Sequence, residues 1–148
     1  MNRYAEMRKR QQQEANALPI GFAFSEKQFD EMMKGWGLDP DNDIDKIYKM
    51  GGMGGFYQRK DARLIQDTFK RHEEELQAAI DGDETGEGFI YEMFLYELDN
   101  HEYGYTGDTE ETLDTLGYTV DEVLGNPRLK RGLEKAATEI YRREAITS

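Results

Sequence analysis

The most apolar part of the chain runs from Gly88 to Tyr103. When successive residues are placed about 100° apart, as in a helix, its large apolar side chains cover most of the circumference, and only Glu92 and Asp99 form a narrow polar strip. A helix that is apolar on nearly every side is stable in water only when other elements surround it. The pattern therefore predicts a central helix over about 88–103, on which the rest of the chain packs.

Apolar residues recur at helical spacing in several other segments as well. These helical segments are 25–36, 61–80, 109–116 and 126–144. Two short apolar runs, Ile47–Met50 and Phe56–Arg59, flank a glycine-rich turn, which predicts two antiparallel strands. An isolated hairpin is only marginally stable, so it must lean on helices. We therefore expect a mainly α, compact helical domain with one small β-hairpin over about 46–59.

The N-terminal segment differs from the rest because it has little to bury. Helix-forming residues are frequent up to Ala17, but Tyr4 and Met7 are the large apolar side chains there. The Leu18-Pro19 pair ends this helix, since the residue before a proline avoids helical geometry. We predict an N-terminal helical extension over residues 1–17 and one globular domain over residues 18–148, a length that suits a single core.

Composition excludes several classes of protein. The 148 residues include no cysteine, so disulfides, thiolate catalysis and Cys-ligated zinc are excluded. No apolar run approaches the roughly 20 residues of a membrane span, and the basic, Gln-rich N-terminus lacks the apolar region of a signal peptide. The net charge of −12 argues against a general phosphate-binding surface. We expect a cytoplasmic protein that binds neither nucleic acid nor membrane directly.

The negative charge is concentrated in one part of the chain. Tyrosines are interleaved with acidic residues between Asp81 and Glu122, where no Lys or Arg occurs, and the two flanking segments are mildly basic. A solvated face that serves solubility is one interpretation, but mixed charges would serve solubility equally well. An acidic surface attracts a basic partner, and tyrosine is enriched in interfaces. We predict a non-enzymatic protein that binds a basic, nucleic-acid-binding protein through Asp99, Glu102, Tyr103, Tyr105, Asp108, Glu110, Glu111 and Asp114.

The loop after Ile80 supports an alternative, a calcium-binding helical protein. In an EF-hand, oxygen ligands occupy positions one, three, five and twelve of the loop, and glycine occupies position six. Here these positions are taken by Asp81, Asp83, Thr85, Glu92 and Gly86. Position eight, which is normally Ile or Val, is Gly88. An acidic, solvated connection between two helices explains the same residues, so calcium is the cofactor only of this alternative.

A third hypothesis concerns the two histidines of the chain. His72, Glu97 and His101 fall on the apolar sides of their predicted helices. Two imidazoles and a carboxylate are ligands of iron and zinc sites and serve equally in general acid-base catalysis. The competing interpretation is a buried polar cluster that only stabilises the core.

Three segments carry a resemblance to a known group of proteins. The segments Asn16–Ser25, Thr85–Asp108 and Arg131–Ala136 resemble a family of small acidic proteins carried on conjugative elements of gut Gram-positive bacteria. The resemblance brings no assigned activity and no assigned catalytic residues. It implies a role in transfer, maintenance or evasion of host defence, for which small acidic DNA mimics are a recurrent solution.

Overall fold

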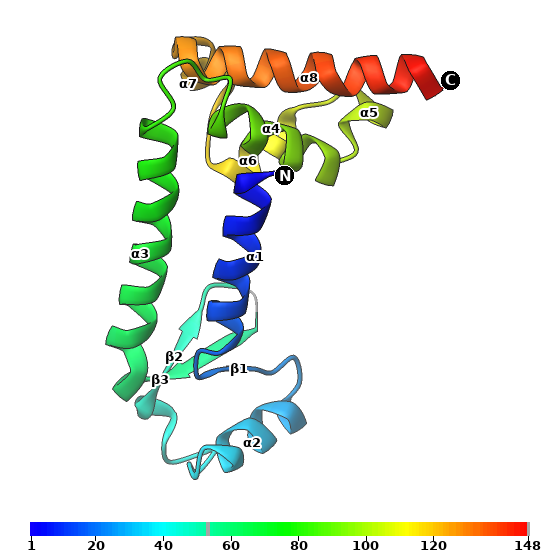
Figure 1. The fold of residues 1–148 in the computed structure, drawn as a ribbon. Helices are drawn as coiled ribbons and strands as arrows, with labels where there is room; N and C mark the ends of the chain where they lie inside the picture. The colour runs from blue at the N-terminus through cyan, green and yellow to red at the C-terminus, as the bar shows by residue number, and fades with distance from the viewer. Residues whose placement is uncertain (53, 148) are drawn as a thin grey trace. The chain divides into compact units, whose positions relative to one another are not determined.

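The computed structural model describes residues 1–52 and 54–147, which form a mainly helical fold with a small antiparallel sheet. The predicted fold class is thus confirmed (Figure 1). No described helix combines the length and the apolar character that crossing a lipid bilayer requires. The helices are α1 (Arg3–Asn16), α2 (Glu26–Gly35), α3 (Ala62–Asp81), α4 (Phe89–Asn100), α5 (Tyr103–Thr106), α6 (Glu110–Leu116), α7 (Val120–Leu124) and α8 (Pro127–Thr147), and the strands are β1 (Ile20–Phe22), β2 (Ile47–Met50) and β3 (Gly55–Gln58).

Contacts between residues group the chain into two units, which we describe separately. Unit 1 comprises Met1–Arg10 and Glu74–Ser148, and unit 2 comprises Gln11–Glu73. The helices α1 and α3 each contribute residues to both units. Because this grouping reflects contacts and not independent folding, the predicted extension over residues 1–17 and domain over residues 18–148 stay a prediction.

Helix α4 is the centre of unit 1, as its apolar sequence predicts. Its side chains Ile90, Met93, Phe94 and Leu98 are fully buried. The helix packs mainly against α8, which lies alongside it in Figure 1. Buried residues of α6, α7 and α8 complete the core around it, namely Leu113, Val123, Leu129, Ala136 and Ile140.

The first turn of α1 also belongs to this core. Tyr4 is only 1% exposed, and its ring lies 6.0 Å from that of Phe89 and 5.6 Å from that of Tyr96, measured between ring centroids. Burial raises the pKa of Tyr4 to about 12, because the ionised phenol would lose its hydration. The expectation that this helix has little to bury is therefore wrong for Tyr4.

A glycine sets the distance between α4 and α8. A Cβ atom on Gly132 would lie 2.5 Å from Cγ2 of Ile90 and 2.8 Å from the carbonyl oxygen of Gly86. Real Cβ atoms do not approach other atoms this closely, so only glycine allows the α8 backbone to lie here. The buried face of α4 is thereby covered by backbone as well as by side chains.

Unit 2 is built on a three-stranded antiparallel sheet in the order β1-β3-β2. The predicted hairpin is the β2–β3 pair, and β1 adds a strand that the sequence pattern did not indicate. One face of the sheet packs on α2, where Phe56 meets Phe29 edge to face and Gly21 lies under Met32. This contact supplies the helical support that a short hairpin needs.

We predict that Gly132→Ala destabilises the protein by about 1–3 kcal/mol, because the added methyl group overlaps atoms of α4 and of the loop before it. In an open helix the same exchange normally stabilises by about 0.5–1 kcal/mol. Gly35→Ala is the matched control, since no atom lies within 4 Å of the added Cβ at that site. Urea unfolding followed by circular dichroism measures both variants. Equal responses of the two would contradict the close helix packing.

Candidate functional site

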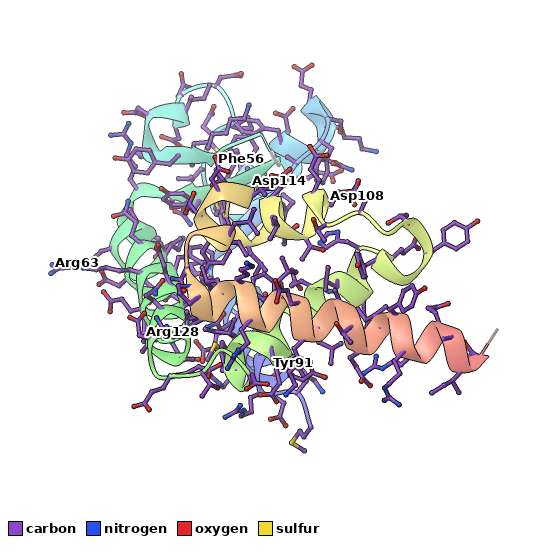
Figure 2. All side chains as sticks on the ribbon, turned by 90° about the horizontal axis from the view of Figure 1, so that it is seen from above. Phe56, Arg63, Tyr91, Asp108, Asp114 and Arg128 are labelled. Atoms are coloured by element: carbon purple, nitrogen blue, oxygen red, sulfur yellow. The ribbon has the colours of Figure 1, made fainter. Side chains whose placement is uncertain are left out.

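The candidate interaction site is the segment from Glu102 to Asp114, which we call the acidic surface. Thr112 and Leu113 are buried and anchor α6, so the neighbouring carboxylates face solvent. Asp108 stands just before α6, and its Oδ1 accepts a hydrogen bond of 2.9 Å from the backbone N–H of Glu110 (Figure 2). A carboxylate at this position compensates the exposed N–H groups of a helix start.

The predicted partner-binding residues are mostly accessible. Tyr103 is half-buried against the core. Tyr105 is 92% exposed, which is unusual for so large an aromatic side chain. The other predicted residues are also exposed, namely Asp99, Glu102, Asp108, Glu110, Glu111 and Asp114. Their role in binding stays a prediction.

Within the acidic stretch, which runs from Asp81 to Glu122, the described basic residues of α1 and α8 form ion pairs only with carboxylates of its first part. Arg3 pairs with Glu92 through a 2.7 Å hydrogen bond, Arg131 lies 3.7 Å from Glu87, and Arg143 lies 3.3 Å from Asp99. In the second part, four carboxylates form no ion pair with any described Lys or Arg: Glu102, Asp108, Glu110 and Asp114. The described arginines of α1 and α8 therefore leave these four charges of the acidic surface uncompensated.

Asp83, a predicted calcium ligand, organises the loop between α3 and α4. Its Oδ1 accepts a 3.0 Å hydrogen bond from the N–H of Gly86, and its Oδ2 accepts from those of Gly88 at 3.0 Å and Ile90 at 2.9 Å. Burial raises the pKa of this carboxyl, but the backbone donors outweigh burial and hold the pKa below its ordinary value. Asp83 thus caps α4 from a position several residues before the helix.

Arg128 of α8 holds the other side of the same loop. Its Nη1 donates to the carbonyl oxygens of Ile80, Asp81 and Asp83 at 3.1, 3.3 and 2.9 Å. Two carbonyls at the end of α3 and one in the loop after it are thereby satisfied by one guanidinium. The loop is fixed between the sequence-distant helices α3 and α8, which the local calcium-loop pattern did not indicate.

The remaining predicted calcium ligands also have partners within the protein. Asp81 accepts from Gln77 at 2.8 Å, Thr85 accepts from the N–H of Glu87 at 3.1 Å, and Glu92 pairs with Arg3. Among the described residues, no three histidine or carboxylate side chains form a group suited to a metal ion. Calcium binding stays a hypothesis in which the ion must compete with Arg3 and with backbone donors.

The three members of the predicted His/Glu cluster divide between the two units. In unit 2, Nε2 of the buried His72 lies 2.6 Å from Oε2 of Glu14, and Arg71 donates to the same oxygen at 2.9 Å. These two hydrogen bonds lower the pKa of Glu14 to about 2. Sequence reasoning missed Glu14 as the partner of His72. The available signal was that the predicted N-terminal helix carries carboxylates, and a buried imidazole needs a hydrogen-bonding or charged partner.

In unit 1, Glu97 and His101 have separate partners. Glu97 is 5% exposed, its Oε1 accepts from Asn100 at 3.2 Å, and its carbonyl oxygen accepts from Thr112 at 3.2 Å. The Nε2 atom of His101 lies 3.0 Å from the hydroxyl of Thr115. Its Nδ1 lies 3.5 Å from Glu111. These contacts tie α4 to α6 and so position the acidic surface.

The chain belongs to a family of unknown function (DUF7659), whose model matches residues 3–139. No curated protein and no solved structure matches the chain. The family match takes in α1 through most of α8, and therefore residues of both units.

We expect Asp83→Ala to lower the free energy of unfolding by about 1–3 kcal/mol, because three backbone N–H groups lose their acceptor. The exposed neighbour Glu84 provides the control, and Glu84→Ala should change stability by less than about 0.5 kcal/mol. Urea unfolding in buffer without calcium measures both. A loss below about 0.5 kcal/mol for Asp83→Ala would show that the carboxylate does not hold the loop.

Glu14 should make the stability of the protein depend on acid pH. Its pKa falls from 4.5 in the unfolded chain to about 2 in the folded protein. A carboxyl with a lowered folded pKa stabilises above the unfolded value, and this stabilisation is lost as the pH falls toward the folded value. The stability difference between wild type and Glu14→Gln should therefore shrink between pH 4.5 and pH 2.

Thermal unfolding at several pH values in that interval measures the effect. Glu26→Gln removes an exposed carboxylate of α2 and serves as the control for the loss of one negative charge. A difference between wild type and Glu14→Gln that stays constant with pH would mean that His72 and Arg71 do not hold the Glu14 carboxylate in solution.

Proposed function

We propose that this member of the family is a non-enzymatic interaction protein, whose acidic surface binds a basic protein that itself binds nucleic acid. The observation that carries the proposal is the set of carboxylates at Glu102, Asp108, Glu110 and Asp114, which are exposed and have no described Lys or Arg partner. Charges that are not compensated within the molecule attract an oppositely charged surface and speed its association.

The distribution of ion pairs supports this proposal more strongly than the net charge does. Solubility alone would be served by any arrangement of the acidic residues. Here Arg3, Arg131 and Arg143 pair with Glu92, Glu87 and Asp99, and none of them pairs with the carboxylates beyond Glu102. The carboxylates that pair with arginines are thus separated from those that do not. The unpaired ones present a patch of negative charge, which is the feature that a basic groove recognises.

Tyr105 gives the surface an apolar anchor. Its exposed ring lies in α5 between Glu102 and Asp108. An aromatic ring that is exposed in the free protein and buried in a complex contributes more binding free energy than the charges around it, which mainly set orientation and rate.

Glu102 itself has a φ of 56°, a backbone conformation that residues with side chains rarely adopt.

The resemblance to proteins of conjugative elements suggests what the partner does. In that context an acidic protein that occupies the nucleic-acid groove of a host or element protein would inhibit it, as a DNA mimic or an anti-defence protein. The carboxylates of the acidic surface would then take the place of backbone phosphates, which dominate the affinity of such grooves for nucleic acid.

A variant that neutralises the acidic surface tests the proposal. It combines Asp108→Asn, Glu110→Gln, Glu111→Gln and Asp114→Asn, and the amide oxygen at position 108 can still accept the hydrogen bond from residue 110. Proteins captured from the lysate of the source cell by the wild type should be lost with this variant, by about tenfold or more. Stability should change little, because the four side chains are exposed.

The matched control removes the same number of exposed carboxylates from unit 2, as Glu26→Gln, Glu31→Gln, Asp41→Asn and Asp45→Asn. This control should capture the same proteins as the wild type. Captured proteins should bind duplex DNA or RNA in isolation, and added duplex should displace them. Equal losses with both variants, or capture that duplex does not reduce, would contradict the proposed role of the acidic surface.

A further inference from the structure

Unit 2 contains an apolar groove of about 930 Å³ that is lined by the sheet, by α1 and α3, and by the Leu18 segment between α1 and β1. This volume lies within the range of about 300–1,000 Å³ that is typical of small-molecule sites. All of its lining residues belong to unit 2, so the groove is complete within that unit. Neither the acidic surface nor the loop of Asp83 contributes to it, so its occupant is independent of the proposed function.

The sheet provides an apolar floor for the groove. In the register of the strands, Phe22 and Met50 both stand opposite Gly55, and Ile20 stands opposite Tyr57, so these residues share one face. None of them carries a charge. Because a side chain at position 55 would lie among those of Phe22 and Met50, the glycine there leaves the floor low.

Helix α3 provides a long wall. Ile65, Phe69 and Glu73 follow one another at intervals of four residues, so they share one stripe that extends about 12 Å along the helix axis. The helix follows β3 after a single short turn, which puts Ile65 at the end nearer to the sheet and Glu73 at the far end (Figure 1). The groove is therefore elongated, with an apolar end at the sheet and a carboxylate at the other end.

Helix α1 closes the groove beside α3 without adding charge. The side chains that it contributes to the lining are Gln12, Ala15 and Asn16. Nε2 of Gln11 donates a hydrogen bond of 3.2 Å to the carbonyl oxygen of His72, which holds α1 against the far end of the groove. The electrostatics of the groove are thus set by the charged residues of α3 and of the sheet.

Glu73 is a lining charge that the protein leaves without a partner. Lys49 stands opposite Phe56, so its side chain leaves from the face of the sheet that packs on α2. Lys70 interacts with another group of the protein. The exposed carboxylate of Glu73 forms no hydrogen bond and no ion pair with any described residue. In a chain with a net charge of −12, this local charge and the overall field both favour a cation.

The apolar lining is open to water. Phe22 is 60% exposed and Phe69 is 38% exposed. Apolar side chains that remain accessible in a groove of this size indicate a binding site. A linear apolar body would cover these two rings, and a positive charge at its end would reach Glu73. We propose that this groove binds a cationic amphiphile, a molecule with an alkyl chain along the groove and an ammonium head group at Glu73.

Three ligands of equal chain length and different charge test this proposal: dodecylamine, dodecanol and dodecanoate. Each competes, below its micelle-forming concentration, with N-phenyl-1-naphthylamine on the full-length wild type. This uncharged probe becomes more fluorescent in an apolar site. Dodecylamine should displace the probe at a concentration about threefold lower than dodecanol and about tenfold lower than dodecanoate, because only the amine pairs with Glu73. Equal or better competition by either of the other two would overturn the cationic assignment, and so would the absence of displacement by dodecylamine.

Replacement of the carboxylate tests the position of the head group. Glu73→Gln should weaken dodecylamine binding by about threefold and leave dodecanol binding unchanged. Asp67→Asn is the matched control, since it removes an exposed carboxylate of the same helix that does not line the groove. This control should bind dodecylamine like the wild type. Equal weakening by both variants would mean that only the overall charge attracts the amine, which would overturn the assignment to Glu73.

The apolar part of the site is tested separately. Phe22→Ser and Phe69→Ser should each weaken dodecylamine binding by about tenfold, because each removes a large apolar contact. Phe24→Ser and Leu64→Ser are the controls, since these side chains are 75% and 54% exposed in the same two segments but do not line the groove. Circular dichroism verifies the fold of each variant. Equal weakening by a control and by its groove variant would overturn the proposal. A dimer that Phe22→Ser dissociates, in the absence of dodecylamine binding, would instead identify a second copy of the chain as the occupant.

Discussion

The fold of unit 1 depends on the close approach of α8 to α4 at Gly132. Helix α4 is apolar on nearly every side, so it is stable only when the surrounding elements exclude water from all of them. Glycine at position 132 lets the backbone of α8 reach Ile90 and the carbonyl of Gly86. The same approach brings Arg128 to the carbonyls at the end of α3 and so fixes the loop before α4.

The packing of the terminal helices also decides where negative charge remains. Arg3 of α1 and Arg131 and Arg143 of α8 lie beside the acidic residues nearest to α4. The carboxylates from Glu102 to Asp114 follow in shorter helices that these arginines do not pair with. A chain with alternating basic and acidic segments thus folds into a surface on which only part of the acidic stretch is compensated, and that remaining part carries the proposed function.

Several polar residues that resemble a chemical site in the sequence serve the structure. Asp83 and Glu92 sit at calcium-ligand spacing, yet one accepts three backbone N–H groups and the other pairs with Arg3. His72 has its partner in Glu14, a residue far away in sequence. Spacing along one helix specifies which residues share a face, but the partner across that face comes from tertiary packing.

The sequence by itself determined the mainly helical fold, the central apolar helix and the β2–β3 hairpin, because these follow from local periodicity and turn residues. It also indicated the acidic stretch, since charge is a property of composition. Only the tertiary structure decided that Tyr4 is buried, that β1 joins the sheet, and which carboxylates arginines neutralise. The apolar groove of unit 2 belongs to this second group as well. These features join residues that are far apart along the chain, and no periodicity within one segment encodes which distant segment it will meet.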